Sequence, residues 1–281
     1  MSGGRDVAAR LNGVLFPLGA GGAVLVSVLL AHACDFFLHE FAHSFTAWGL
    51  GWMADPLALA YGPPTIDNIL MQQQIDDNVD YGPIFASGHG LQAALIAAAG
   101  PLLANGGAAI LCDRLLLVLT RGTQTPGRGK ILLLWSLTWV AAFNVFNVWS
   151  YAPIRALATH ADMALLARGL GVPGWVLFPF VTGFALWLAI RFSCVSLPRV
   201  QSSFARRSWA TARPGAGRWG RMFGPVVLAA TVPFFSMSGL GGTYGLAAIL
   251  MSYASLFFLV PALIMACWAA SSPEPSENSV R

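Results

Sequence analysis

The sequence predicts an all-α, polytopic membrane protein with about six transmembrane helices. Of its 281 residues, 56% are hydrophobic and only 10% are Asp, Glu, Lys or Arg, whereas soluble domains usually carry about 25% charged residues. The charges lie between apolar runs, and several runs reach the ~20 residues that a helix needs to cross ~30 Å of hydrocarbon. Six spans nearly use up the length, so we expect one membrane domain and no separate soluble domain.

The first predicted helix covers residues 23 to 49. It begins after a glycine-rich stretch and ends at Gly49 and Gly51, which are natural helix stops. Residues 50 to 88 contain Asp but no Lys or Arg, and Gly and Pro break this segment too often for it to span, so it is expected to be a polar loop. The remaining spans are predicted at residues 90 to 117, 131 to 151, 172 to 193, 224 to 240 and 245 to 268.

These elements divide into four segments. Residues 1 to 22 form an N-terminal segment, and residues 23 to 170 form a core of three spans with the polar loop. Residues 171 to 270 form three further spans with a basic loop at 191 to 223, for which a basic amphipathic stretch on the membrane surface is the alternative. Residues 271 to 281 are rich in Ser, Pro and Glu and are expected to be disordered.

The positions of the basic residues predict the orientation and the surroundings of the chain. Lys and Arg concentrate in the N-terminal segment, the 120 to 130 loop, the 191 to 223 segment and the C-terminal tail, and cytoplasmic loops are the ones enriched in these residues. We therefore expect a multi-pass protein of a bacterial-type cell membrane with both termini in the cytoplasm. The net charge of +4 lies where it can contact anionic lipid headgroups, so no nucleic-acid partner is expected.

One motif in the first span is typical of metal chemistry. Residues 39 to 43 read His-Glu-Phe-Ala-His, and residues four apart lie on one helix face about 6 Å apart, so His39 and His43 can bind one metal ion. Glu40 lies beside them and can accept a proton from water. A solvated polar face is the ordinary explanation of such a pattern, but ionisable groups inside an apolar span are costly and therefore mark functional sites.

Two further polar residues lie on the same face of this span. Asp35 comes one turn before His39 and is expected to accept a hydrogen bond from that imidazole, or else to bond a partner on another span. His32 lies roughly 10 Å from His39, too far to share its metal ion, and is expected to hydrogen-bond a neighbouring helix.

A catalytic zinc ion needs a third protein ligand and leaves its fourth position to water. The candidates outside the first span are Asp162, His160, His89 and Asp113. We expect Asp113 to pair with the adjacent Arg114 and His89 to lie at the surface. Asp162 and His160 follow the third span, which ends on the same side as the first, so topology allows either to reach the metal.

Three motifs in order then resemble one known family. The first is His-Glu-Phe-Ala-His with the glycine turn at 49 to 51; the second is Ala-Gly-Pro-Leu-Leu-Ala-Asn at 99 to 105; the third is Phe-Asn-Val at 146 to 148, followed by Asp162. Over residues 23 to 170 they resemble the site-2 protease family of intramembrane zinc metalloproteases. The resemblance implies a three-helix catalytic core that hydrolyses peptide bonds within or near transmembrane segments of membrane-protein substrates.

Carried onto this sequence, the resemblance implies a zinc ion bound by His39, His43 and Asp162, with Glu40 as the base. The charge count puts this site toward the non-cytoplasmic side, whereas the family is usually described with its zinc nearer the cytoplasm. The sequence also departs from the family pattern, because Met163 replaces the Gly that usually follows the ligand Asp. His160 therefore remains the alternative third ligand.

The resemblance also implies a substrate-binding or structural role for asparagine side chains. Asn147 is the first candidate, Asn144 lies on the same helical face, and Asn105 ends the second motif. Ser150 stands near the place where the family usually has Pro.

Two other functions remain open. In a metal-ion transporter or sensor, the polar face of the first span would line an ion path, but the fifth and sixth predicted spans hold no His, Asp or Glu to extend it. A catalytically inactive relative retained as a membrane scaffold is the other alternative.

Overall fold

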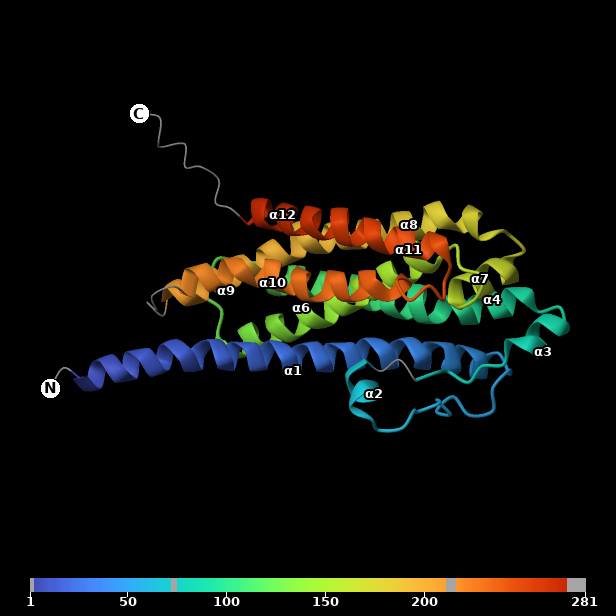
Figure 1. Cartoon of the computed structure of the whole chain (residues 1–281), viewed down its shortest axis with the longest axis horizontal. Coiled ribbons are helices and arrows are strands. Elements are labelled where there is room, and N and C mark those ends of the chain that lie inside the picture. The colour runs from blue at the N-terminus through green and yellow to red at the C-terminus, as the bar shows by residue number, and fades with distance from the viewer. Residues whose placement is uncertain (1–2, 72–74, 211–215, 272–281) are drawn as a thin grey trace, which may run out of the picture.

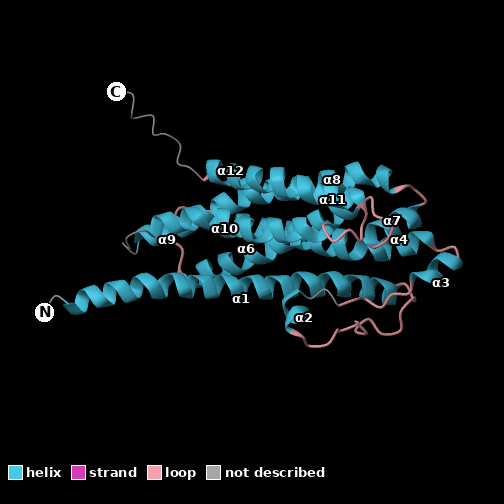
Figure 2. Cartoon of the chain, in the orientation of Figure 1, coloured by secondary structure: helices cyan, strands magenta, loops and turns pink. Residues whose placement is uncertain are grey.

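The computed structural model describes residues 3–71, 75–210 and 216–271, and its named elements in this part of the chain are helices (Figures 1 and 2). Six of the helices it describes are long and apolar enough to cross a membrane: Gly21–Gly49, Gly90–Leu119, Arg128–Ile154, Gly174–Arg207, Gly220–Gly239 and Leu246–Ala270. The prediction of an all-α membrane protein with six spans is therefore confirmed.

Three of the six spans consist of two α-helices joined by a short π-helical turn. In chain order the elements are α1 (Gly3–Gly49), α2 (Ile66–Met71), α3 (Tyr81–Ala86), α4 (Gly90–Ala98), η1 (Ala99–Asn105), α5 (Gly106–Leu119), α6 (Arg128–Trp149), η2 (Ser150–Ile154), α7 (Asp162–Leu170), α8 (Gly174–Arg191), η3 (Phe192–Ser196), α9 (Leu197–Ala210), α10 (Ala216–Ser236), η4 (Met237–Gly239), α11 (Leu246–Ala254), η5 (Ser255–Leu259) and α12 (Val260–Ala270). The joining turns are η1, η3 and η5; η2 is a π-helical turn at the end of the third span, and η4 is a 3-10 turn at the end of the fifth.

The structure differs from the expected boundaries in two places. Helix α1 begins at Gly3, ahead of the predicted start at 23. The segment expected as a basic loop at 191 to 223 is largely helical, because α9 buries Leu197 and Val200 against the bundle and packs along α10. Three of its Arg residues, Arg199, Arg206 and Arg207, lie on the amphipathic helix α9, so charge density alone does not identify a loop.

Helix α6 forms the centre of the bundle. It packs against α1, α5, α8 and α10, and Trp139, Phe143 and Phe146 are fully buried within it. A helix that is apolar on all sides is suited to such a central position.

The helices on either side of α1 are held in a fixed register. Helix α6 runs parallel to α1, because Trp135 Nε1 donates to Ser27 Oγ at 2.7 Å and Asn147 Nδ2 donates to Asp35 Oδ2 at 2.6 Å. The α4–η1–α5 span runs antiparallel to α1 and packs on it mainly through η1. Pro101 lies in η1 and lacks a backbone N–H, so the change to π-helix occurs where the α-helical bonding is interrupted.

The segment between α1 and α4 lies against the C-terminal half of α1 (Figure 1). An isolated bridge joins Ala60 to Asp76. Ser44 Oγ on α1 donates to the backbone oxygen of Asp77 at 3.1 Å. This contact brings one acidic residue of the segment close to the His39–His43 motif.

Candidate metal centre

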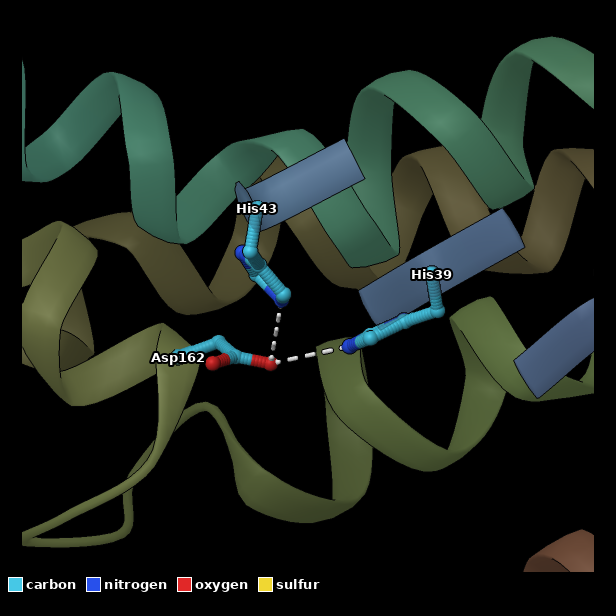
Figure 3. A group of neighbouring side chains, drawn as sticks. All are labelled: His39, His43 and Asp162. Carbon is cyan, nitrogen blue, oxygen red and sulfur yellow. Dashed lines mark hydrogen bonds and ion pairs between the residues drawn. The ribbon is translucent and has the colours of Figure 1, made fainter. Parts of the chain in front are cut away.

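His39, His43 and Asp162 converge on one point in the helix bundle. His39 Nε2 lies 3.3 Å and His43 Nε2 lies 3.6 Å from Asp162 Oδ2, and Figure 3 shows both imidazoles of α1 directed at that carboxylate. One ligand atom from each residue lies within 4.8 Å of the other two. The structure thus brings together the three residues that the family resemblance implies as metal ligands.

The Nδ1 atom of each imidazole, which faces away from Asp162, has a hydrogen-bond acceptor. His43 Nδ1 donates to the backbone oxygen of Ile96 at 2.7 Å, and His39 Nδ1 donates to Asn105 Oδ1 at 2.7 Å. An imidazole protonated at Nδ1 carries its lone pair at Nε2 when neutral. These hydrogen bonds therefore orient both rings and favour the tautomer in which Nε2 is free to bind a metal ion.

The spacing of the three ligand atoms suits a shared cation. Zinc bonds of about 2.0–2.1 Å in tetrahedral geometry place neighbouring ligand atoms about 3.4 Å apart, close to the observed 3.3 Å and 3.6 Å. A charge-assisted hydrogen bond would be shorter, at about 2.7–2.9 Å. Two imidazoles and one carboxylate are also the donor types that zinc takes, so the residues fit this metal.

Gly100 leaves room beside the two imidazoles. A Cβ atom at this position would lie 2.8 Å from His39 Nε2 and closer still to His43 Nε2. Any larger residue would therefore fill the space between the ligands. The motif at residues 99 to 105 thus contributes to the site because its glycine, Gly100, has no side chain to occupy this space.

Asp162 reaches the site from the first turn of α7. The preceding Ala161 has a φ of 72°, which is uncommon for a residue with a side chain, and Met163 is buried against Ala94 and Ala97 of α4. Met163, where the family usually has Gly, thus anchors α7 on the neighbouring span. Burial alone would raise the pKa of Asp162, but the electrostatic interaction with His43 and the close contacts of Oδ2 with both imidazoles hold that pKa below its usual range. The carboxylate stays ionised, the form that binds a cation.

Asp35 supports the site through an intermediate residue. We expected it to accept a hydrogen bond from His39, but Asn105 does so, and Asn105 Nδ2 donates to Asp35 Oδ1 at 2.8 Å. Asn147 Nδ2 donates to the other carboxylate oxygen at 2.6 Å. Asp35 and His39 extend from one helix face toward neighbouring spans, so a residue of η1 fits between them. Its alternative partner, a residue on another span, is the one observed.

The three candidate asparagines have different surroundings. Asn105 contacts His39, and Asn144 accepts a hydrogen bond from Asn105 Nδ2 at 3.0 Å while its own Nδ2 donates to the backbone oxygen of Val140. Asn147 donates to Asp35, and its Oδ1 is buried without a hydrogen-bond partner. Asn144 therefore has a structural position, whereas Asn147 retains a free acceptor.

Glu40 lies between the metal-ligand group and the polar segment. Glu40, His43 and Asp77 form a second group whose ligand atoms lie within 4.8 Å of one another. Asp77 is 7% exposed, and burial raises its pKa from the ordinary 3.8 to about 6. No pattern in the sequence distinguishes Asp77 from the other acidic residues of its segment.

A cavity of about 470 Å³ opens from this region, and Glu40, Asn147, Tyr151 and Arg155 are among its lining residues. The Tyr151 ring packs on His39 at a centroid distance of 4.5 Å. The cavity therefore extends from Glu40 to Arg155, just beyond η2, and Tyr151 lies both on the cavity wall and against His39. Sequence reasoning did not identify Tyr151, Arg155 or Gly100 as site residues.

The other predicted candidates lie elsewhere. The His160 ring stacks on Tyr244 at 5.0 Å, and among the described residues it belongs to neither candidate metal group. His89 is exposed beside Trp52. The His32 ring lies among aromatic rings, including Phe143 and Phe234.

Asp113 has a different ionic partner from the one predicted. Arg191 Nε donates to Asp113 Oδ2 at 2.8 Å, and Ser196 donates to Oδ1. The predicted pair with Arg114 is therefore wrong: Asp113 points into the bundle, where a neighbouring span supplies the cation.

No protein-family model matches the chain, and neither the curated proteins nor the solved structures contain a match. Functional assignment therefore depends on the residues and their arrangement.

Proposed function

We propose that the chain is an intramembrane zinc metalloprotease that hydrolyses peptide bonds within or near transmembrane segments of membrane proteins. The observation that carries this proposal is the convergence of His39, His43 and Asp162 within 4.8 Å, among helices apolar enough to cross a membrane. The donor types, their spacing and the oriented imidazoles all support zinc as the metal.

Zinc held by these residues would supply Lewis-acid chemistry, by lowering the pKa of water and polarising a peptide carbonyl. Glu40 follows His39 directly and lines the cavity. It is 8% exposed, so bulk water competes little for its carboxylate. In the proposal Glu40 accepts the proton of the attacking water and passes it to the leaving amine.

The substrate must enter as an unwound strand. A helix in lipid hides its carbonyls in backbone hydrogen bonds, so it must open locally before attack. The free Oδ1 of Asn147 offers an acceptor for a backbone N–H of such a strand, while the bond to Asp35 fixes the orientation of the amide. Substrates with helix-breaking residues are therefore expected to be cleaved best.

The polar contacts give little support to an ion path. Asp35 is fully buried, and its two carboxylate oxygens accept hydrogen bonds from Asn105 and Asn147. This arrangement braces the helices around His39 and occupies both oxygens of Asp35, so this carboxylate is not open to a passing ion.

The test uses the full chain purified in detergent with a transmembrane reporter peptide that contains a Gly-Pro break. Wild-type protein should cleave the reporter, while Glu40→Gln should bind zinc but lose at least about 100-fold in rate. Asp67→Asn, which removes a charge from the exposed surface of α2, is the matched control and should cleave normally. Equal cleavage by wild type and Glu40→Gln would exclude Glu40 as the base, and zinc-dependent ion flux in proteoliposomes without cleavage would favour the transporter.

A further inference from the structure

We propose that Arg155 forms a subsite that binds a carboxylate of the substrate peptide. This inference deepens the proposed function, because it assigns a substrate chemistry to the cavity that begins at Glu40. It rests on the lining of that cavity and on the contacts of one guanidinium group.

Two tyrosine rings hold Arg155. Its Cζ atom lies 4.4 Å from the Tyr151 ring centroid and 4.6 Å from the Tyr244 ring centroid, and all three residues line the cavity. A cation–π contact of this kind joins the charge of the guanidinium to a ring and satisfies none of its N–H groups. The N–H groups of Arg155 therefore still need an acceptor.

The guanidinium has no anionic partner in the described part of the protein. No carboxylate oxygen of the described residues lies within 4.0 Å of its nitrogen atoms, in contrast to Arg191, which pairs with Asp113. Its Nε atom is buried without a hydrogen-bond partner, and a buried donor left unsatisfied is costly. A planar carboxylate matches the paired N–H groups of arginine better than a neutral amide does.

The position of Arg155 fits a peptide ligand. It follows the span Arg128–Ile154 directly, so it lies at the end of a membrane helix, where substrate charges are tolerated more readily than deeper in the bilayer. Tyr151 links it to the metal site, because the same ring contacts His39 at 4.5 Å and Arg155 at 4.4 Å.

Two sources of carboxylate meet this description: an Asp or Glu side chain and the C-terminus of the substrate. The probe is a short fluorescent peptide of Ala, Leu and Gly with a single Glu placed at each position in turn. Each peptide has a Gln twin, and the Glu-free peptide is made with a free and with an amidated C-terminus. The two pairs distinguish the two sources.

Binding is measured by fluorescence anisotropy with full-length Glu40→Gln protein in neutral detergent, so that the readout does not require turnover. A peptide with a carboxylate at the favoured place should bind about tenfold more tightly than its neutral twin. Adding Arg155→Gln should reduce this preference to below about twofold, and adding Arg155→Lys should retain part of it. Arg168, which is exposed and lies over the Phe85 ring at 3.9 Å, provides the matched control: Arg168→Gln should leave the preference unchanged.

The proposal is overturned if carboxylate and neutral peptides bind equally to the protein that retains Arg155, a comparison that needs no Arg155 variant to fold. It is also overturned if the carboxylate preference survives Arg155→Gln. The same holds if phosphatidylglycerol added to the micelles abolishes the preference while phosphatidylcholine does not, because Arg155 would then bind a lipid headgroup in place of the peptide. A carboxylate preference without cleavage by wild type would contradict the protease and support the subsite. Cleavage by wild type without any carboxylate preference would support the protease and contradict the subsite.

Discussion

Asn105 accepts a hydrogen bond from His39 Nδ1 at 2.7 Å and joins that imidazole to the buried carboxylate of Asp35 through its own Nδ2. This link orients one proposed zinc ligand from a different span. Removing it should weaken metal binding without removing a ligand.

Asn105→Leu is expected to lower zinc affinity about 10- to 100-fold, because His39 loses the partner that fixes its ring and tautomer. Competition with a fluorescent chelator measures this change. Asn144→Leu is the control, since Asn144 is equally buried but reaches His39 only through Asn105. Equal zinc affinities for wild type and Asn105→Leu would show that the contact has no role in binding.

Gly100→Ala is expected to abolish stoichiometric zinc binding, because the new Cβ would occupy the space beside both Nε2 atoms. Gly107→Ala, in α5, is the control, since a Cβ there meets no heavy atom within 4 Å. Metal analysis of the two purified variants is the measurement. If both retain zinc equally, the metal lies elsewhere.

The raised pKa of Asp77 predicts that the stability of the protein depends on pH. Burial raises its pKa from 3.8 to about 6, so the folded state favours the protonated acid; this contribution is complete below pH ~4 and is lost as the pH rises through ~6. Asp77→Asn should therefore unfold at the same temperature as wild type near pH 4 and at a higher temperature above pH 6, when both are measured with chelator present. Asp67→Asn should show no such divergence, and a wild type that gains stability relative to Asp77→Asn above pH 6 would reverse the assigned sign.

Removing only one partner of the ion pair between Arg191 and Asp113 is expected to destabilise the protein. Arg191→Leu leaves the Asp113 carboxylate, 9% exposed, without its cation, and should lower the free energy of unfolding by about 3 kcal/mol or more. The double variant Arg191→Leu with Asp113→Leu should recover most of this loss. Denaturant titration in mixed micelles compares them; a double variant less stable than Arg191→Leu would mean that Asp113 is not destabilising when unpaired.

Local patterns predicted the spans and the His39–Glu40–His43 motif, because hydropathy and four-residue helical spacing depend on neighbours in the sequence. The approach of Asp162 to the two imidazoles depends on how α7 packs on α4; topology left Asp162 and His160 both open, and only the family resemblance favoured Asp162. The same limit explains the wrong partner predicted for Asp113, which pairs with Arg191 on another span, and explains why the partner of Asp35 stayed open between His39 and another span.

Gly100 and Asp77 show two further limits. Gly100 acts through a close approach between spans, which a sequence of small residues does not reveal. Asp77 lies in a segment with several other Asp residues, and only its hydrogen bond from Ser44 and its burial distinguish it. Likewise, the basic charges at 191 to 223 suggested a loop, because the packing of α9 against α10 depends on contacts between distant parts of the chain.

The most direct test of the metal centre is X-ray absorption at the zinc edge, combined with metal analysis, on the purified full-length chain. We predict one zinc ion per chain with two imidazole nitrogens and carboxylate or water oxygens at about 2.0–2.1 Å, and loss of that zinc in the combined variant His39→Ala with His43→Ala. Absence of zinc in wild-type protein, or a spectrum unchanged by removal of both imidazoles, would contradict the account.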